Sequence, residues 1–107
     1  MKKAAISEIA YEDLRFGLTH YQLAGGARLS ERFFEDIFSV IRKIESHPEA
    51  GSPRAGQALE FAQLRSWRLS TFQTWAIFYI QSGDYIEILR ILDGRQDIGP
   101  TMFLGYA

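Results

Sequence analysis

Three strand-like segments follow one another in the C-terminal half of the chain, at residues 64–71, 75–81 and 85–92. Nearly every residue from 75 to 80 is β-branched or aromatic, which is typical of a strand covered on both faces. Ser82-Gly83-Asp84 is a short glycine-containing connection of the kind that closes a hairpin. The pattern therefore predicts a three-stranded antiparallel meander with residues 75–81 in the middle of the sheet.

The N-terminal half predicts a short strand followed by two amphipathic helices. Residues 2–6 are small and flanked by lysines, as in an edge strand. Ser7 is a good N-cap for a first helix that ends near Gly25-Gly26. A second helix spans about residues 27–46, and Pro48 marks its end because proline disfavours a helical residue before it. Apolar residues recur at helical spacing: Ala10, Leu14, Gly17, Leu18 and Tyr21, then Leu29, Phe33, Ile37, Val40, Ile41 and Ile44.

Two helices joined by a glycine link form an αα-hairpin, and its apolar stripes need a surface to cover. The meander supplies that surface. Residues 48–57 have the composition of a loop, and residues 59–63 that of a turn leading into the sheet. At 107 residues the chain is long enough for one core and too short for two. We therefore predict a single α+β domain over residues 1–107, with a short N-terminal strand and an αα-hairpin packed on an antiparallel sheet.

Composition and charge exclude several classes of function. The chain has no cysteine, which excludes disulfides, thiolate metal sites and cysteine nucleophiles. Its formal net charge is −1, whereas dedicated nucleic-acid binders are usually basic. No apolar run approaches the roughly 20 residues that span a bilayer, and the apolar stretch after Lys2-Lys3 is too short for a signal-peptide core. We therefore expect a cytoplasmic protein without a membrane segment.

Arg90 is the most unusual residue of the predicted sheet. Period-two alternation gives the last strand one face made of Ile86, Ile88, Arg90 and Leu92. A charge in an otherwise apolar row needs a partner or an open groove. We expect Arg90 either to pair with a carboxylate such as Glu87 or Asp97 or to line a surface groove.

The order of these segments resembles a known family. The two helices are followed by Ser46-His47-Pro48-Glu49-Ala50-Gly51-Ser52-Pro53-Arg54, by an Arg-x-x-Arg-Leu strand at residues 65–69 and by Ile-Phe-Tyr at residues 77–79. The pattern closes with Gly-Asp-Tyr-Ile-Glu-Ile-Leu-Arg-Ile-Leu-Asp-Gly-Arg-Gln-Asp at residues 83–97. Over about residues 5–98 the chain resembles the RelE/ParE superfamily of bacterial toxins from type II toxin–antitoxin modules, and its ParE-like branch in particular.

The resemblance implies a small fold with two helices on an antiparallel sheet and a cognate ParD-like antitoxin, with which the toxin forms a hetero-oligomer. ParE-like members are associated with poisoning of DNA gyrase, and RelE-like members cut messenger RNA on the ribosome. A ParE-like toxin acts by binding, so we expect no catalytic set, no cofactor and no metal. The residues that we expect to bind a partner are Trp67, Arg68, Arg90, Arg95, Met102 and Phe103.

A RelE-like ribonuclease is the first alternative. Cutting RNA with its own 2′-hydroxyl needs a base, a general acid and cations that hold the phosphate charge. The cations would be Arg65, Arg68, Arg90 and Arg95. Both histidines, however, lie in the helical half, Tyr106 lies in a displaced tail, and Asp93 stands where ParE-like relatives commonly carry histidine. The ribonuclease is favoured only if the arginines converge in one concave site.

A non-toxic module that only binds its antitoxin is the second alternative.

Three further features of the sequence are explained by structural roles. Trp67 and Trp75 are expected to pack within the fold, and Glu8, Glu12 and Asp13 are expected to form a solvated acidic face rather than a metal site. The apolar residues 102–104 either dock on the chain's own sheet or are covered by a partner.

Overall fold

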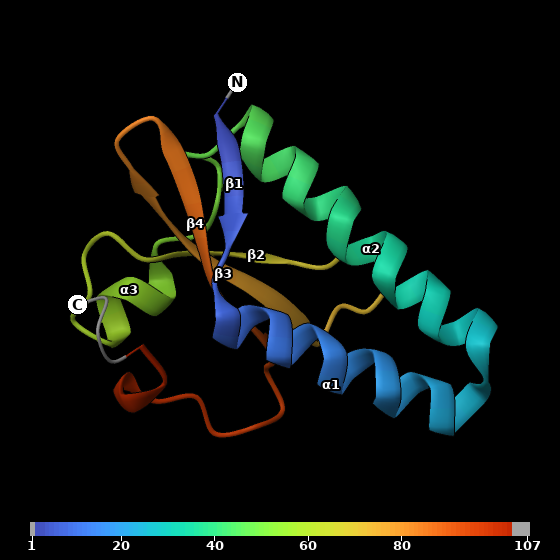
Figure 1. Ribbon diagram of the computed structural model, residues 1–107. Helices are drawn as coiled ribbons and strands as arrows, with labels where there is room; N and C mark the ends of the chain where they lie inside the picture. Colours follow the sequence, from blue (N-terminus) through green and yellow to red (C-terminus); the bar gives the residue numbers. More distant parts are fainter. Residues whose placement is uncertain (1, 104–107) are drawn as a thin grey trace.

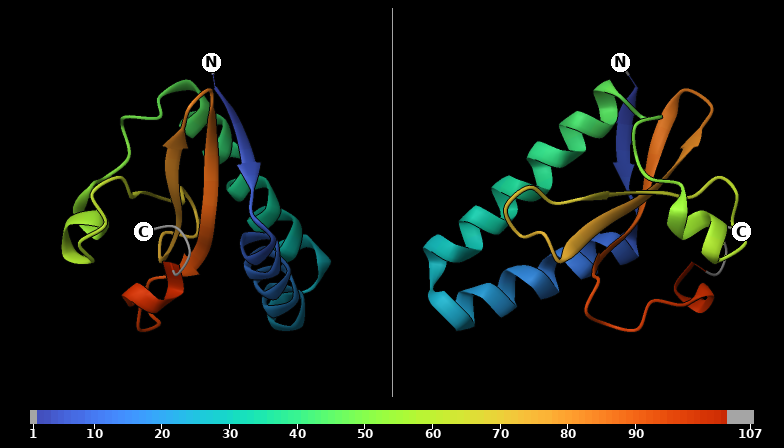
Figure 2. Two further views of the ribbon diagram at one scale, coloured as in Figure 1. Left: turned by 60° about the vertical axis from the view of Figure 1, so that its left-hand side comes forward. Right: turned by 180° about the vertical axis from the view of Figure 1, so that it is seen from behind.

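Three layers make up the described part of the chain, residues 2–103 of this computed structural model. A helical hairpin covers one face of a four-stranded sheet, and a short helix and a C-terminal turn lie on the other side (Figure 1, Figure 2). The architecture confirms the predicted α+β fold. In chain order the elements are β1 (Lys3–Ile6), α1 (Glu8–Gly25), α2 (Ala27–Ser46), α3 (Arg54–Ala58), β2 (Arg65–Arg68), β3 (Trp75–Ser82), β4 (Tyr85–Asp93) and the 3-10 turn η1 (Pro100–Phe103).

The sheet is mixed rather than wholly antiparallel. Its strand order is β1-β4-β3-β2, so β3 is an interior strand, as predicted. β2, β3 and β4 form the expected antiparallel meander. β1 lies at the edge, as expected, but it pairs parallel with β4, from Lys3 beside Tyr85 to Ile6 beside Ile88. Local composition indicates that a segment is a strand, but it does not fix the direction in which that strand pairs with one at the far end of the chain.

The two long helices begin and end where the sequence predicts. The Ser7 hydroxyl accepts a hydrogen bond from the Ala10 N–H at 3.1 Å and so caps α1. A single residue, Gly26, joins α1 to α2 with a φ of +88°, a region that favours glycine. Gly17 allows the helices to approach closely, because a Cβ there would lie 2.5 Å from the Phe33 ring. The hairpin therefore depends on glycine at its turn and at its contact.

An apolar cluster lies on each face of the sheet. The helix-side cluster confirms the predicted helix stripes as core and comprises Ala10, Leu14, Phe33, Ile37, Val40, Ile41, Ile44, Leu69, Trp75, Ile77, Tyr79, Ile86, Ile88 and Ile91. The opposite cluster comprises Phe61, Leu64, Phe78, Leu89, Leu92 and Phe103. The second cluster explains why β3 and β4 carry few polar residues on either face.

A β-bulge in β4 changes which residues share a face. The pairing of β3 with β4 shifts by one residue between Phe78 and Tyr79, so that Leu89 is the extra residue. The helix-side cluster takes Ile86, Ile88 and Ile91, and the opposite cluster takes Leu89 and Leu92. The prediction that Arg90 and Leu92 share a face with Ile88 is therefore wrong, because period-two alternation does not continue through a bulge.

β2 is shorter than predicted because the Asp36 carboxylate on α2 binds backbone N–H groups that would otherwise continue the strand. Asp36 is 7% exposed and accepts hydrogen bonds from the backbone N–H groups of Ser70, Thr71 and Phe72 at 3.1, 2.8 and 2.9 Å. These N–H groups cannot then pair with β3. The strand consequently ends at Arg68.

Residues 54–58 form α3 at the end of residues 48–57, which the sequence predicts to be loop. Gly56 lets this short helix lie against the chain that follows it, since a Cβ there would be 2.5 Å from the carbonyl oxygens of Phe61 and Leu64. Proline and glycine favour a loop at the level of sequence. The helix forms because its backbone packs directly against Phe61 and Leu64, which belong to the opposite cluster.

Tyr79 ties the segment after α2 to the centre of the sheet. Its buried hydroxyl donates to the Pro48 carbonyl at 2.8 Å and accepts from the Gly51 N–H at 3.1 Å. Burial raises the pKa of this hydroxyl above its ordinary value of 10.0, while the Gly51 N–H and the charge of Arg65 act in the opposite direction. The hydroxyl is therefore protonated at neutral pH and available as a donor.

We expect Tyr79→Phe to lower the free energy of unfolding by about 1–3 kcal/mol at neutral pH, because two buried backbone groups lose their partner. Below pH 10.0 the hydroxyl is protonated in the folded and the unfolded chain, so its contribution is complete. At higher pH the unfolded chain loses this proton first, which lowers the stability of the wild type. The difference between wild type and variant should therefore shrink, as measured by urea denaturation at neutral pH and at about pH 11.

Tyr85→Phe is the matched control, because the Tyr85 ring is 42% exposed. It should change the free energy of unfolding by less than about 0.5 kcal/mol at neutral pH. Equal effects of the two substitutions would contradict the role assigned to the Tyr79 hydroxyl.

Candidate functional site

Side chains of α1 complete the edge of β4 where β1 ends. β1 pairs with β4 only as far as Ile88, whose carbonyl accepts from the Ser7 N–H at 3.0 Å. Beyond that point the Ser7 hydroxyl donates to the Leu89 carbonyl at 3.0 Å, and the Ile91 N–H donates to an Asp13 carboxylate oxygen at 3.0 Å. The start of α1 thus takes the place of a neighbouring strand.

Arg90 lies at this edge, and its guanidinium is bound within the protein. Nε and Nη2 donate to the two carboxylate oxygens of Asp13 at 2.8 and 2.9 Å, and Nη1 donates to the Met102 carbonyl at 3.1 Å. The two charged side chains are only 16% and 12% exposed. Arg90 therefore has the partner that its position requires, but that partner is Asp13 on α1 rather than Glu87 or Asp97.

Arg65 lies elsewhere, at the start of β2. Its Nη1 donates to the Gly51 carbonyl at 2.8 Å. The side chain also lines a small cavity of about 250 Å³ with Ala62, Gln63 and Gln81. Arg65 and Tyr79 therefore both hydrogen-bond to Gly51, in the segment that follows α2.

Arg68 and Arg95 are the two predicted arginines that line the same depression. They line a groove of about 390 Å³ at the end of the sheet, together with Gln73, Thr74, Trp75, Ala76 and Gly94. The Arg68 side chain is exposed and makes no hydrogen bond or ion pair with any described residue. Arg95 pairs with Asp93, to which its Nε donates at 3.0 Å, and this hydrogen bond holds the pKa of the Asp93 carboxyl below its usual range. Arg68 is thus the uncommitted charge of the groove.

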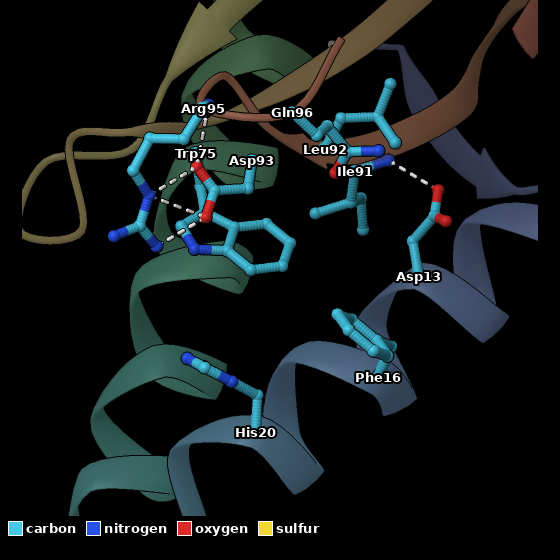
Figure 3. Close-up of a pocket in the computed structure, with 9 residues that line it drawn as sticks. All are labelled: Asp13, Phe16, His20, Trp75, Ile91, Leu92, Asp93, Arg95 and Gln96. Carbon is cyan, nitrogen blue, oxygen red and sulfur yellow. Dashed lines mark hydrogen bonds and ion pairs between the residues drawn. The ribbon is translucent and has the colours of Figure 1, made fainter. Parts of the chain in front are cut away.

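A larger depression of about 490 Å³ lies beside this groove, between α1 and the C-terminal end of β4. Phe16 and His20 reach it from α1, opposite Trp75 and the β4 residues (Figure 3). Phe16 is 68% exposed. The complete lining is Asp13, Phe16, His20, Trp75, Ile91, Leu92, Asp93, Arg95 and Gln96. We name this depression the α1–β4 groove.

The other predicted partner-binding residues pack against the chain's own clusters. Trp67 is half-buried against the helix-side cluster. Met102 packs on the opposite cluster, and Phe103 is only 2% exposed, with its ring centroid 5.5 Å from that of Phe78. The tail therefore docks on its own sheet as far as residue 103, and Leu104 lies outside the described residues. In this structure Arg68 and Arg95 are the exposed members of the predicted set.

The four arginines of the ribonuclease alternative do not converge. Arg65, Arg90 and the pair formed by Arg68 and Arg95 occupy three separate places. His20 lies in the α1–β4 groove, and Tyr106 lies outside the described residues. Within residues 2–103, no group of three or more His, Cys, Asp or Glu side chains is arranged to hold a metal ion. The condition that would favour a ribonuclease is not met.

Comparison with known families identifies the chain. Residues 6–98 match the family described as "ParE toxin of type II toxin-antitoxin system, parDE". The chain belongs to the ParE toxin family. It is the toxin component of a type II toxin–antitoxin module, for which an antitoxin is the partner. The resemblance to the ParE-like branch is thereby confirmed.

A solved structure shares the fold of this ParE-family chain. It is described as "Chromosomal ParDE TA system from P. aeruginosa" and superposes with a TM-score of 0.71. The two sequences are 22% identical, and the match covers 85% of this chain and 94% of the other. A search of curated proteins gives no match. Among the described helices of the ParE-family chain, none is long and apolar enough to cross a membrane.

Two residues of the ParE-family groove were not found by sequence reasoning. Asp13 is not part of a solvated acidic face, because its carboxylate binds Arg90 and the Ile91 N–H. Nothing local to Asp13 distinguishes it from its acidic neighbours. Phe16 does carry a signal, since it lies outside the stripe of α1 that packs on the sheet and is therefore an apolar residue on a polar face.

We expect Asp13→Ala to lower the free energy of unfolding by about 2–4 kcal/mol, because Arg90 would remain largely buried without a counter-charge and the Ile91 N–H would lose its acceptor. Chemical denaturation of the purified protein measures this change. Asp93→Ala is the matched control. The Asp93 side chain is 16% exposed, but its partner Arg95 is 63% exposed, so this substitution leaves no buried charge without a counter-charge. Equal losses from the two substitutions would contradict a structural role for Asp13.

Proposed function

We propose that this ParE-family toxin acts by binding DNA gyrase and that a ParD-like antitoxin, encoded by the neighbouring gene, neutralises it. The observation that carries the proposal is the separation of Arg65, Arg90 and the pair Arg68 and Arg95. Cleavage of RNA needs cations, a base and an acid around one phosphate, whereas a binding toxin needs none of these. The separation of the arginines therefore supports binding.

The charges in the α1–β4 groove also weigh against RNA cleavage. His20 and Arg95 share the groove, and together they are the nearest approach to an acid–base site. Asp93, however, binds Arg95 and brings a negative charge to the same place. Arg90 is committed to Asp13. Arg90 and Arg95 are each paired with a carboxylate, so neither is left to hold the charge of a phosphate, and messenger RNA is the alternative target rather than the proposed one.

Exposed apolar side chains on the helical hairpin support a protein partner. Phe16, Leu23 and Phe34 are 68%, 84% and 45% exposed. Phe16 and Leu23 lie about two turns apart on α1 and so share a face, and exposed apolar side chains that gather on one face mark a place where another protein binds. We propose that the antitoxin covers part of this surface, that the resulting complex is a hetero-oligomer, and that both proteins act in the cytoplasm, where gyrase meets DNA.

Inducible expression of the chain in a bacterial host tests the proposal. Three cultures are compared: one with the toxin alone, one with the toxin and the product of the neighbouring gene, and one with a toxin gene stopped early by a nonsense codon. Growth, plasmid supercoiling and the integrity of messenger RNA are measured after induction. A parallel assay adds the purified protein to purified gyrase and relaxed plasmid.

The proposal predicts growth arrest with lost supercoiling or trapped cleaved DNA, intact messages, and rescue by the neighbouring gene product. Messages cut at codons, with gyrase unaffected, would show that the target is the ribosome. Normal growth with a folded product would leave only antitoxin binding. Arrest without rescue would contradict the proposed antitoxin.

A further inference from the structure

Three exposed apolar side chains form one stripe along α1. Ile9, Phe16 and Leu23 are 42%, 68% and 84% exposed. Each is seven residues from the next, and seven residues make nearly two turns of an α-helix, so the three side chains lie on one face. At a rise of about 1.5 Å per residue the stripe is about 21 Å long. We name it the α1 stripe.

The described residues leave the α1 stripe uncovered. Ala10 and Leu14 on another face of α1 pack in the helix-side cluster. The second helix contacts α1 at Gly17, which lies against the Phe33 ring. In Figure 1, α1 lies at the lower margin of the molecule with α2 above it. The stripe is therefore an apolar face of the helical hairpin that is open to a partner.

The charges near the α1 stripe differ between its two ends. Glu8 and Glu12 lie at the N-terminal end and are exposed. No acidic residue occurs in residues 14–30, and the C-terminal end of the stripe leads through the hairpin turn to the exposed Arg28. Arg15 lies next to the middle of the stripe and does not distinguish its ends. One end is thus acidic and the other basic.

Antiparallel pairing of two copies matches both the apolar spacing and the charges. With a two-fold axis beside Phe16, that ring meets the Phe16 ring of the second copy, and Ile9 meets Leu23 of the second copy at both ends. A two-fold interface uses the same patch on both subunits. Glu8 lies as far before Phe16 as the end of α1 lies after it, so it comes next to the turn that leads to Arg28 of the second copy. Parallel pairing would instead place like charges together.

We propose that two copies of the free toxin form a dimer by packing their α1 stripes together in antiparallel orientation. The inference goes beyond the proposed function, since it assumes neither gyrase nor an antitoxin. Another protein would need an apolar stripe of the same spacing with the opposite order of charges, and a second copy of this chain supplies both. A contact between two single helices is a small interface of the weak, transient kind. Monomer and dimer should therefore exchange at micromolar concentrations.

Sedimentation velocity of the purified full-length chain tests the inference. From about 1 µM to about 1 mM the wild type should change from monomer to dimer, with no larger species because a two-fold interface is closed. Phe16→Glu places two like charges against each other at the axis and should weaken the dimer about tenfold or more. Phe34→Glu is the matched control, because Phe34 is an aromatic residue of the hairpin that is 45% exposed and lies on α2, outside the stripe.

A charge exchange tests the antiparallel orientation. Glu8→Arg alone, or Arg28→Glu alone, places like charges together at both ends of the dimer and should weaken it, most strongly at low salt. An equal mixture of the two variants should associate better than either alone, because both end contacts then join opposite charges. Arg42→Glu is the control for Arg28→Glu, since Arg42 is an exposed arginine of α2 far from the turn. Its mixture with Glu8→Arg should bring no such gain.

Each outcome supports or overturns the inference. A wild type that stays monomeric over the whole concentration range overturns it, and so does an equal loss of association in Phe16→Glu and Phe34→Glu. Absence of a gain in the mixture of Glu8→Arg with Arg28→Glu overturns the antiparallel orientation. A dimer that is weakened by Phe16→Glu alone and recovered in that mixture supports the inference. Circular dichroism of each variant checks that the fold is retained.

Discussion

An incomplete strand edge determines much of this structure. β1 is too short to pair with the whole of β4, and buried backbone groups that lack a partner are costly. The first turns of α1 supply the missing partners, through the Ser7 hydroxyl and the Asp13 carboxylate. Asp13 also neutralises Arg90, whose guanidinium reaches on to the Met102 carbonyl. One carboxylate therefore joins the helical layer, the sheet and, through Arg90, the C-terminal turn. The bulge at Leu89 lies directly before Arg90 on the same strand edge.

The same interaction shapes the surface beside it. Asp13 is a wall residue of the α1–β4 groove as well as the partner of Arg90, so the position of α1 relative to β4 sets the width of the groove. Phe16 lies one turn further along α1 and enters the groove from there. A substitution of Arg90 or Asp13 would therefore change stability and groove shape together. Loss of activity in such a variant would not identify either residue as a contact of the antitoxin or the target.

The sequence predicts the elements of this fold well because their signals are local. The Ser7 cap, the Gly26 link and the apolar stripes of α1 and α2 are all encoded within one helix or one turn. The parallel pairing of β1, the early end of β2 and the bulge in β4 depend instead on contacts between distant segments. Asp36 is an ordinary polar residue of α2 until the chain after Arg68 folds onto it. For the site, sequence finds the arginines but not their partners, because an ion pair between α1 and β4 leaves no trace in the spacing of either residue.

Charged residues that the fold uses and charged residues that it leaves exposed have different effects on stability when they are replaced. Arg90 and Asp13 are largely buried, so replacing one strands the other and destabilises the fold. The Arg68 side chain is exposed and makes no hydrogen bond or ion pair with a described residue, so its replacement should change stability little. Exposed charges contribute to the choice of partner more than to stability, both by attraction to the right partner and by repulsion of wrong ones.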